Sequence, residues 1–315
     1  MYKKRIILIG TSSIAEFHVK ALRKAGLEVV AVASSNTNSI SQKRFAKKNG
    51  IKKEFTSWKK MIQEEKYDGI VIATRIQSTI EILLESIKKN VPILVEKPIS
   101  FESKKIENIL EKSHPFIMVG YNRRFYKTVK KIKELVIKEK DQILAVMFAP
   151  ENLDEKSFLK NSSHSIDILR YIFGEIKLKH KEKIMINKTK KTVTATFTNK
   201  KNDLIKLIIN WEASDNFSLS IFIRNKKILL KPYEELFIFD EMKIIEPDST
   251  SPIRKYVPKM KKNIKLESAD RKIKPGFFQQ SKTFAEMIKK KKITKDMATL
   301  EDAYKNILLC EKLLK

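Results

Sequence analysis

The segment RIILIGTSSIAEFHVKALRK, residues 5–24, joins a short apolar run to an amphipathic stretch through a single glycine, Gly10. Short, unbroken apolar runs are typical of strands that are buried on both faces of a parallel sheet. The stretch after Gly10 is long enough for a helix and places its apolar residues on one face. The segment therefore predicts a strand, a tight turn and a helix.

The same alternation continues to Gly120. Further runs rich in Ile and Val occupy 28–34, 68–74, 91–96 and 115–120. Amphipathic stretches of helix length separate them, at 13–25, 38–49, 57–65, 77–89 and 102–113. Strand and helix repeated about five times is typical of a doubly wound parallel sheet, so we expect an α/β domain over residues 1–120.

After Gly120 the pattern changes, and we expect a second domain over residues 121–315. Alternating apolar and polar residues predict an antiparallel sheet in its middle part. In chain order, we expect a basic helix at 125–139, a strand at 142–149, a polar loop at 150–163 and a helix at 164–173. These are followed by a set of alternating strands at 175–240, a long loop with four prolines at 246–275 and two closing helices at 277–290 and 299–314.

Length and cysteine content narrow the class of protein. The 315 residues suit two domains of ordinary size. The one cysteine, Cys310, cannot form a disulfide within the chain or a thiolate metal site, and we expect no metal. No apolar run is long enough for a signal peptide or a membrane span, so we expect a cytoplasmic protein without a membrane partner.

The charge of the chain is strongly positive. The net charge is +29, but only 10 of the 66 basic residues are Arg, and the Lys are spread along the whole sequence. Nucleic-acid binding surfaces tend to concentrate Arg and aromatic residues on one face. We therefore interpret the charge as Lys-rich composition that attracts anionic ligands such as phosphorylated sugars, and expect no nucleic-acid partner.

The turn after the first strand has part of a dinucleotide-binding pattern. Such a site presents backbone amides at a helix N-terminus to a pyrophosphate, with glycine where the backbone comes close. Only the first glycine of G-x-G-x-x-G/A is present, because Ser12 replaces the second and Ala15 occupies the third position. An ordinary strand–helix turn capped by Thr11 or Ser12 fits equally. The cofactor-binding candidates here are Gly10, Thr11, Ser12, Ser13 and Ile14.

The end of the second strand carries Ser34 and Ser35 where NAD sites usually have an acid that binds the adenosine ribose. Lys43 and Arg44 follow within the next helix. Small polar groups with nearby cations suit a 2′-phosphate, which favours NADP slightly over NAD. The alternative is an ordinary polar turn.

Glu96, Lys97 and Pro98 directly follow another strand of the predicted parallel sheet. A Lys at the carboxyl end of such a strand points into the crevice where these sheets bind ligands. Pro98 biases Lys97 toward an extended conformation. The alternative for Lys97 is a solvated side chain in a Lys-rich protein.

Polar residues at two places near the second domain suit substrate binding and proton transfer. Asn122, Arg123 and Arg124 follow the last strand of the first domain, although Asn122 also suits the N-cap of the next helix. His164 and Asp167 are three residues apart, so both lie on one face of a helix. Histidine accepts and returns a proton near neutral pH, and a cap or packing role is the alternative for His164.

Together, the strand-GxxxxA turn, Glu-Lys-Pro at 96–98, GYNRRF at 120–125 and HxxD at 164–167 resemble the glucose-fructose oxidoreductase/inositol dehydrogenase (Gfo/Idh/MocA) family. Residues 14–34, Trp211 and PGFFQQ at 275–280 are similar to the family's pattern as well. The resemblance implies an N-terminal Rossmann domain and a C-terminal α+β domain with a large, mostly antiparallel sheet. It also implies a homodimer or homotetramer formed through the open face of that sheet.

The resemblance implies an NAD(P)-dependent oxidoreductase that moves hydride between nicotinamide and a secondary hydroxyl or keto carbon of a sugar, including phosphorylated or nucleotide-linked sugars. In it, Lys97 contacts the nicotinamide ribose and the reacting hydroxyl, and His164 exchanges the proton. Further cofactor-binding candidates are Thr74, Arg75 and Glu96, and the substrate-binding candidates are Asn122, Arg123, Arg124, Lys160, Asn161 and Asp167.

The sequence departs from the family in two places. Lys160 stands where the family often has an acid four residues before its histidine, with Asn161 as a polar substitute. Thr74 and Arg75 open a segment that lacks the family's Pro, Asn and His. The single glycine of the first turn and Lys160 favour an alternative function, a non-catalytic member of the fold that senses a dinucleotide or a sugar.

Overall fold

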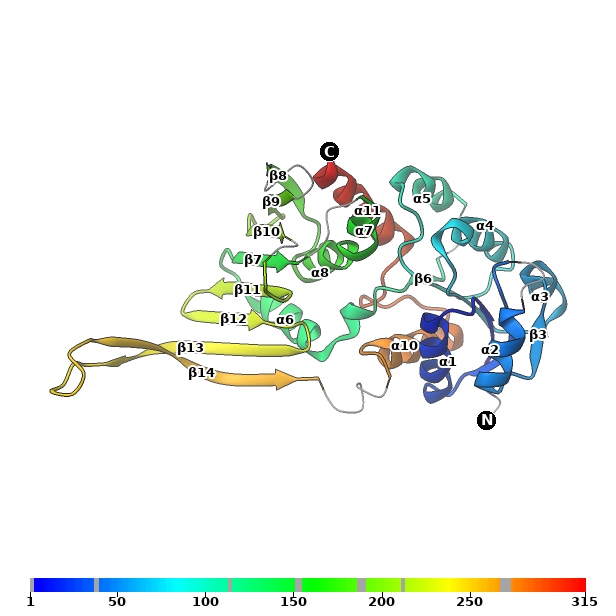
Figure 1. The fold of residues 1–315 in the computed structure, drawn as a ribbon, viewed down its shortest axis with the longest axis horizontal. Coiled ribbons are helices and arrows are strands. Elements are labelled where there is room, and N and C mark those ends of the chain that lie inside the picture. The colour runs from blue at the N-terminus through cyan, green and yellow to red at the C-terminus, as the bar shows by residue number, and fades with distance from the viewer. Residues whose placement is uncertain are drawn as a thin grey trace. The chain divides into compact units, whose positions relative to one another are not determined.

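The protein, seen here in a computed structural model, forms two compact units (Figure 1). Unit 1 comprises Met1–Phe125 and Ser268–Lys312, and unit 2 comprises Tyr126–Glu267 and Leu313–Lys315. The structure describes residues 3–36, 40–112, 115–150, 155–185, 191–210, 213–266 and 273–315. Trp211 lies outside the described residues.

Unit 1 is built on a six-stranded parallel sheet in the order β3-β2-β1-β4-β5-β6. Its strands are β1 (Arg5–Ile9), β2 (Glu28–Ala33), β3 (Lys53–Phe55), β4 (Gly69–Ile72), β5 (Ile93–Val95) and β6 (Ile117–Val119). This is the strand order of a Rossmann fold, so the predicted fold class is confirmed. The sequence did not predict β3, because its three residues lie at the sheet edge and carry no buried apolar run.

The central strands of this sheet are completely buried, which explains their unbroken apolar sequences. Ile6–Ile9 of β1 and Ile70–Ile72 of β4 have no exposed surface. Helix α1 buries Ala15, Val19 and Leu22 in the same hydrophobic cluster, with the helical spacing that the sequence predicted. The helices that connect the strands are α1 (Ser13–Lys24), α2 (Ser41–Asn49), α3 (Trp58–Glu64), α4 (Ile76–Ile87) and α5 (Ser103–Leu110).

Two C-terminal helices, α10 (Phe277–Lys290) and α11 (Leu300–Leu314), contribute most of their length to unit 1. Helix α10 packs against α1, and its residues contribute Phe284 and Ile288 to the core. The Val119 amide donates to the Ala298 carbonyl over 2.8 Å, so the segment before α11 extends the edge of the sheet. The division therefore differs from the predicted boundary between 1–120 and 121–315, because these contacts join residues 273–312 to the Rossmann sheet.

Unit 2 is built on an eight-stranded, mostly antiparallel sheet in the order β14-β13-β12-β11-β7-β10-β9-β8, in which only β7 and β10 pair in parallel. Its strands are β7 (Leu144–Ala149), β8 (Lys177–Met185), β9 (Lys191–Thr198), β10 (Leu204–Asn210), β11 (Ser218–Ile223), β12 (Lys226–Leu230), β13 (Glu235–Ile245) and β14 (Lys255–Lys265). Its helices are α6 (Lys127–Lys138), α7 (Glu155–Asn161) and α8 (Ser163–Phe173). Alternate residues of β7 and β10, such as Met147 and Leu207, are buried, and this confirms the predicted α+β character.

Two predicted loops of unit 2 are wrong. Part of the polar loop 150–163 is the helix α7, which buries Phe158 and Leu159. Part of the proline-containing loop 246–275 is β14, which pairs with an extended β13 in a long hairpin (Figure 1). Prolines and lysines hide the alternation there, and an edge strand tolerates Pro258 because one side of its backbone needs no partner.

The alternative role of Asn122, as N-cap of the next helix, does not hold. Residues Asn122–Phe125 form a short 3-10 turn, η1, and α6 begins only at Lys127 with Tyr126 at its N-cap. The side-chain amide of Asn122 instead donates to the Pro275 carbonyl over 2.8 Å.

Among the described helices, none has the length and apolar character needed to cross a membrane.

Candidate dinucleotide-binding site

The turn after β1 requires a glycine at position 10. Gly10 has a φ of +125°, and a Cβ there would lie 2.1 Å from the Ala73 carbonyl oxygen at the end of β4. The Gly10 amide donates to Ala33 at the end of β2, and the Ala73 amide donates to Ile9, each over 2.8 Å. The carboxyl ends of β2, β1 and β4 are thus drawn together where the strand order reverses, which is where such sheets bind ligands.

The N-terminus of α1 opens at this turn. Ser12 is the N-cap residue, in extended conformation, but its side chain makes no capping hydrogen bond. Ser12 and Ser13 are exposed and Ile14 is half-buried, while Thr11 shares a 3.0 Å hydrogen bond between its hydroxyl and that of Ser41 on α2. The first amides of a helix have no partner inside the helix, so an anion placed here meets donors and the positive end of the helix dipole.

The end of β2 carries small hydroxyls. Ser34 is buried, and its Oγ accepts from the Asn36 amide over 3.3 Å, while Ser35 is half-buried. Lys43 and Arg44 are exposed on the first turn of α2. Residues 33–36 carry no side-chain carboxylate, the group that usually binds the adenosine ribose of NAD.

The turn after β4 is held by hydroxyl hydrogen bonds. The Thr74 and Thr79 hydroxyls lie 3.2 Å apart, and Thr79 Oγ1 donates to the Arg75 carbonyl over 3.1 Å. Arg75 is the N-cap residue of α4, and its side chain is exposed. Thr74 and Arg75 thus lie on the same edge of the sheet as Gly10, on the neighbouring strand end.

The end of β5 holds a carboxylate that the surrounding structure fixes in place. Glu96 Oε1 lies 2.7 Å from Nε2 of His18, a buried residue of α1 whose ring packs on Phe277 at 4.9 Å between centroids. The other oxygen, Oε2, accepts from the Lys97 amide over 3.2 Å. A Cβ at Gly120 would approach this carboxylate to 3.0 Å, so the glycine leaves room for it.

His18 is the residue of this site that the sequence analysis missed. It lies inside residues 14–34, which resemble the family, but one histidine on an amphipathic helix carries no sign of its partner. Its partner is 78 positions away in the sequence, and only the parallel order β1-β4-β5 brings α1 to the end of β5. Lys97, which follows Glu96, is half-buried, and its peptide bond to Pro98 is cis.

Arg124 of η1 is engaged inside unit 1. Its side chain is buried, and its Nη1 donates to the Met297 carbonyl and to Asp302 Oδ2, each over 3.1 Å. Asn122 is buried and bonded to Pro275, whereas Arg123 is half-buried. Of the two adjacent arginines, Arg123 therefore has the greater exposure for contact with a ligand.

The remaining candidate residues lie on α7 and α8 of unit 2. Every residue of α8 is buried, with Asp167 completely so and His164 at 8% exposure. Lys160 and Asn161, at the end of α7, are exposed. Unit 2 thus places the imidazole of His164 in the first turn of the buried helix α8, which closely follows the exposed end of α7.

A parallel sheet in this order, with a glycine-led strand–helix turn where the order reverses, defines a Rossmann-type dinucleotide-binding domain. Residues 4–121 match the family described as oxidoreductase family, NAD-binding Rossmann fold (GFO_IDH_MocA). The Rossmann domain of this chain belongs to the Gfo/Idh/MocA family, which confirms the resemblance predicted from its motifs.

Two curated relatives have related descriptions. The chain is 25% identical over 185 residues to the myo-inositol 2-dehydrogenase of Thermotoga maritima, covering 54% of this chain and 55% of the relative. It is 30% identical over 138 residues to the rhizopine catabolism protein MocA of Rhizobium meliloti, covering 42% of each. The matches thus span about half the length of these relatives.

Solved structures share the fold over nearly the whole chain. A myo-inositol dehydrogenase from Corynebacterium glutamicum superposes with a TM-score of 0.74 and 18% identity, over 99% of this chain and 96% of that one. A dehydrogenase from Chromobacterium violaceum superposes with a TM-score of 0.78 and 14% identity, over 99% and 94%. At such identities the likeness establishes the fold.

Proposed function

We propose that this protein is an NAD(P)-dependent oxidoreductase that transfers hydride between nicotinamide and a secondary hydroxyl or keto carbon of a sugar or polyol. The observation that carries the proposal is the conformation at the end of β5. There the Glu96 carboxylate is held by His18 and accepts a hydrogen bond from the Lys97 amide, which fixes the direction of the chain at Lys97. This strand end shares the carboxyl edge of the sheet with the Gly10 turn, whose exposed serines suit a pyrophosphate. The family match over residues 4–121 supports the same activity.

The chemistry divides between two residues in this proposal. Oxidation of a secondary alcohol removes a hydride from carbon and a proton from oxygen while the C=O bond forms. The nicotinamide, when bound, accepts the hydride. His164 takes the hydroxyl proton on an imidazole nitrogen, and the ammonium group of Lys97 stabilises the negative charge that develops on the oxygen. Reduction runs the same steps in reverse.

The substrate class proposed is a sugar or cyclic polyol, including phosphorylated forms. The relatives named for myo-inositol and rhizopine support a ring with secondary hydroxyls. Arg123, half-buried on η1, suits a phosphate or carboxylate on the substrate, and Lys160 and Asn161 are exposed for polar contacts. Arg124 has a supporting role here, because its guanidinium binds Asp302 and the Met297 carbonyl.

Turnover measurements with matched variants test this proposal. The protein is assayed for nicotinamide reduction with NAD and NADP against myo-inositol, hexoses, sugar phosphates and nucleotide sugars. Lys97→Met and His164→Asn should each lower kcat by about 10²- to 10⁴-fold, the range expected for acid–base and electrostatic groups. The controls are Lys89→Met and His180→Asn, which change exposed residues of the same types and should leave kcat unchanged.

NADP is the proposed cofactor preference. Ser34 and Ser35 with Lys43 and Arg44 nearby suit a 2′-phosphate better than an acid would. Ser35→Asp should therefore shift the preference toward NAD by at least tenfold in kcat/KM. An unchanged ratio of the two cofactors would contradict this part of the proposal.

A non-catalytic sensor remains the alternative function, because the glycine loop has only Gly10 and because Lys160 replaces the family's acid. The two proposals differ in the behaviour of the Lys97→Met and His164→Asn variants. A sensor keeps its dinucleotide or sugar affinity and shows no turnover before or after substitution.

We also propose a homo-oligomer that forms through the open face of the unit 2 sheet. Leu204, Leu144 and Phe222 are register neighbours on β10, β7 and β11, and they are 40%, 39% and 41% exposed. Such a row of apolar side chains on one sheet face is typical of an interaction surface. Sedimentation should show a dimer or tetramer that Phe222→Lys dissociates, whereas a monomeric wild-type chain would contradict the proposal.

A further inference from the structure

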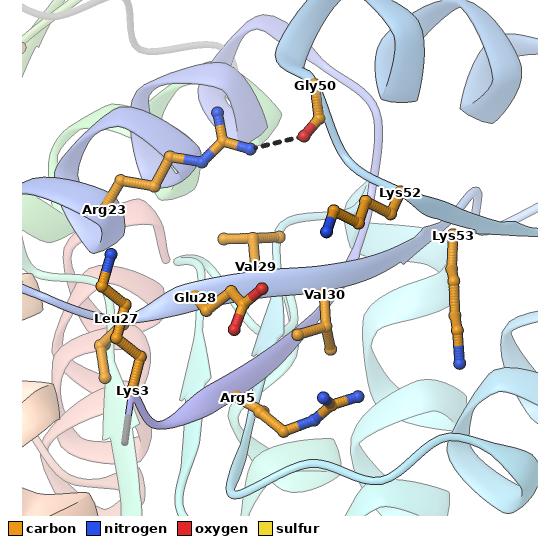
Figure 2. Close-up of a pocket in the computed structure, with 10 residues that line it drawn as sticks. All are labelled: Lys3, Arg5, Arg23, Leu27, Glu28, Val29, Val30, Gly50, Lys52 and Lys53. Atoms are coloured by element: carbon orange, nitrogen blue, oxygen red, sulfur yellow. Dashed lines mark hydrogen bonds between the residues drawn. The ribbon is translucent and has the colours of Figure 1, made fainter. Parts of the chain in front are cut away.

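A hollow of about 630 Å³ lies at the amino edge of the unit 1 sheet (Figure 2). The starts of β1, β2 and β3 form it together with the ends of α1 and α2. The Gly10 turn follows the opposite end of β1, five residues along the strand from Arg5, or roughly 16 Å at the rise of a β-strand. The hollow is therefore separate from the candidate dinucleotide site.

The lining of the hollow is strongly cationic. Its charged side chains are five cations and one carboxylate, namely Lys3, Arg5, Arg23, Lys52, Lys53 and Glu28. Figure 2 shows the cationic side chains distributed around the carboxylate of Glu28. The buried carboxylate of Glu65 pairs with Arg5 and Lys53, each over 2.7 Å. With five cations against Glu28 and Glu65, a net of three positive charges remains at this place.

Three of the five cations have structural partners that fix their positions. Arg5 is held by Glu65 and by the Lys66 carbonyl at 2.8 Å, and Lys53 is held by Glu65. Arg23 lies in the last turn of α1 and donates to the Gly50 carbonyl at the end of α2 over 3.1 Å. A cation near two helix C-termini also compensates their dipoles, so Arg23 has a structural explanation.

Lys3 and Lys52 have no such explanation. Both are exposed, both line the hollow, and neither has an ion-pair partner within the part of the chain that the structure describes. They lie outside α1 and α2, and neither side chain donates to a carbonyl at a described helix end. Two lysines directed at one concavity with an existing positive field raise the local concentration of anions.

We propose that this hollow binds a compact anion with several phosphate groups. A volume of about 630 Å³ lies in the range of small-molecule sites and far exceeds the roughly 30 Å³ of one water, so a single small ion would leave most of it empty. The apolar lining consists of Leu27, Val29 and Val30, without an aromatic residue on which a nucleic-acid base could stack. The ligand is therefore a small polyphosphate-type anion and not a nucleic-acid strand.

Calorimetric titration of the full chain with inorganic tripolyphosphate tests the proposal. The double variant Lys3→Gln/Lys52→Gln should weaken binding at least tenfold, because each of its two substitutions removes a charge that faces the ligand. The matched control is Lys20→Gln/Lys112→Gln, which removes two exposed lysines that do not line the hollow and should change the affinity less than twofold. Glu28→Gln removes a repulsive carboxylate and should tighten binding about threefold.

Saturating NADH and NADPH separate this site from the dinucleotide site, and tripolyphosphate should bind equally well in their presence. The proposal is overturned if either dinucleotide displaces tripolyphosphate, if the two double variants weaken binding equally, or if no saturable binding occurs. It is also overturned if a DNA duplex binds more tightly than tripolyphosphate through the same two lysines. A circular dichroism spectrum unchanged from wild type shows that each exposed-lysine variant is folded.

Discussion

At the scale of single residues, Gly10 occupies a backbone position that leaves no room for a side chain. Its φ of +125° and the 2.1 Å approach that a Cβ would make to the Ala73 carbonyl both exclude a side chain. Gly26 has a φ of +81° but no atom within 4 Å of its would-be Cβ. Gly10 therefore combines a positive φ with a close contact, whereas Gly26 has the positive φ alone.

Gly10→Ala should destabilise the protein by more than about 2 kcal/mol and abolish dinucleotide binding, because the strand end must move away from β4. Gly26→Ala should cost only about 1 kcal/mol, the price of the positive φ alone, and should leave binding intact. Thermal unfolding and nicotinamide fluorescence measure both effects. Equal losses in the two variants would contradict the close approach at Gly10.

Glu65 couples the stability of unit 1 to pH. Burial by itself raises the pKa of this carboxyl, but hydrogen bonds from Lys53, the Lys66 amide and Arg5 outweigh burial and lower the pKa below its ordinary value. A lowered pKa in the folded state gives stability that is present above the unfolded pKa, near 4.3, and is lost as the pH falls through the folded value.

Glu65→Gln should therefore cost about 1–2 kcal/mol at pH 7, since it removes charge-assisted hydrogen bonds from a side chain that is 3% exposed. The difference from wild type should shrink steadily as the pH falls below about 4. Glu81→Gln is the control, because Glu81 is 64% exposed in its pair with Lys59 and should contribute little. Denaturant unfolding at several pH values measures this, and a pH-independent difference would contradict the assignment.

The sequence predicted the candidate residues of the site better than their partners. Gly10, Glu96 and Lys97 follow strands, and local apolar runs are enough to place them. His18 bonded to Glu96 and Arg124 bonded to Asp302 join residues far apart in the chain, so no local pattern contains these pairs. Their partners could be found only from the three-dimensional fold.

At the scale of elements, prediction succeeded where one physical signal dominated. Fully buried strands such as β1 and β4 leave an unbroken apolar run, and α10 and α11 leave a helical period. It failed at β3, α7 and β14, which are short or exposed over much of their length. Their stability comes from neighbouring elements, which a local pattern does not contain.

The outer part of the β13–β14 hairpin gives a direct test at this scale. Strand β13 pairs with β12 only as far as Asp240, and beyond it residues such as Met242, Ile244 and Tyr256 are more than half exposed. Replacing residues 241–259 by Asn-Gly, a two-residue hairpin turn that leaves Asp240 opposite Met260 in register with the Ile238–Lys262 pair, should shift Tm by less than about 3 °C. Leu236→Ala, in the buried part of β13, should by contrast cost about 2–5 kcal/mol. A fall in Tm of 10 °C or more on trimming would contradict this account.

At the scale of the whole molecule, the net charge of +29 favours anionic ligands. Its described part contains an exposed helix N-terminus at the Gly10 turn and a cationic hollow at the opposite edge of one sheet. The first suits a dinucleotide and the second a compact polyphosphate. Both are local arrangements, and average composition would not reveal either.

The central claim is that the Rossmann domain holds a nicotinamide dinucleotide at the Gly10 turn. Equilibrium binding of NADH and NADPH to the purified full chain, freed of copurified dinucleotide and followed by nicotinamide fluorescence at low and moderate salt, tests it most directly. We predict saturable binding with a Kd below about 1 mM, tighter for NADPH, and its loss in Gly10→Ala but not in Gly26→Ala. A folded chain that binds neither dinucleotide would contradict the claim.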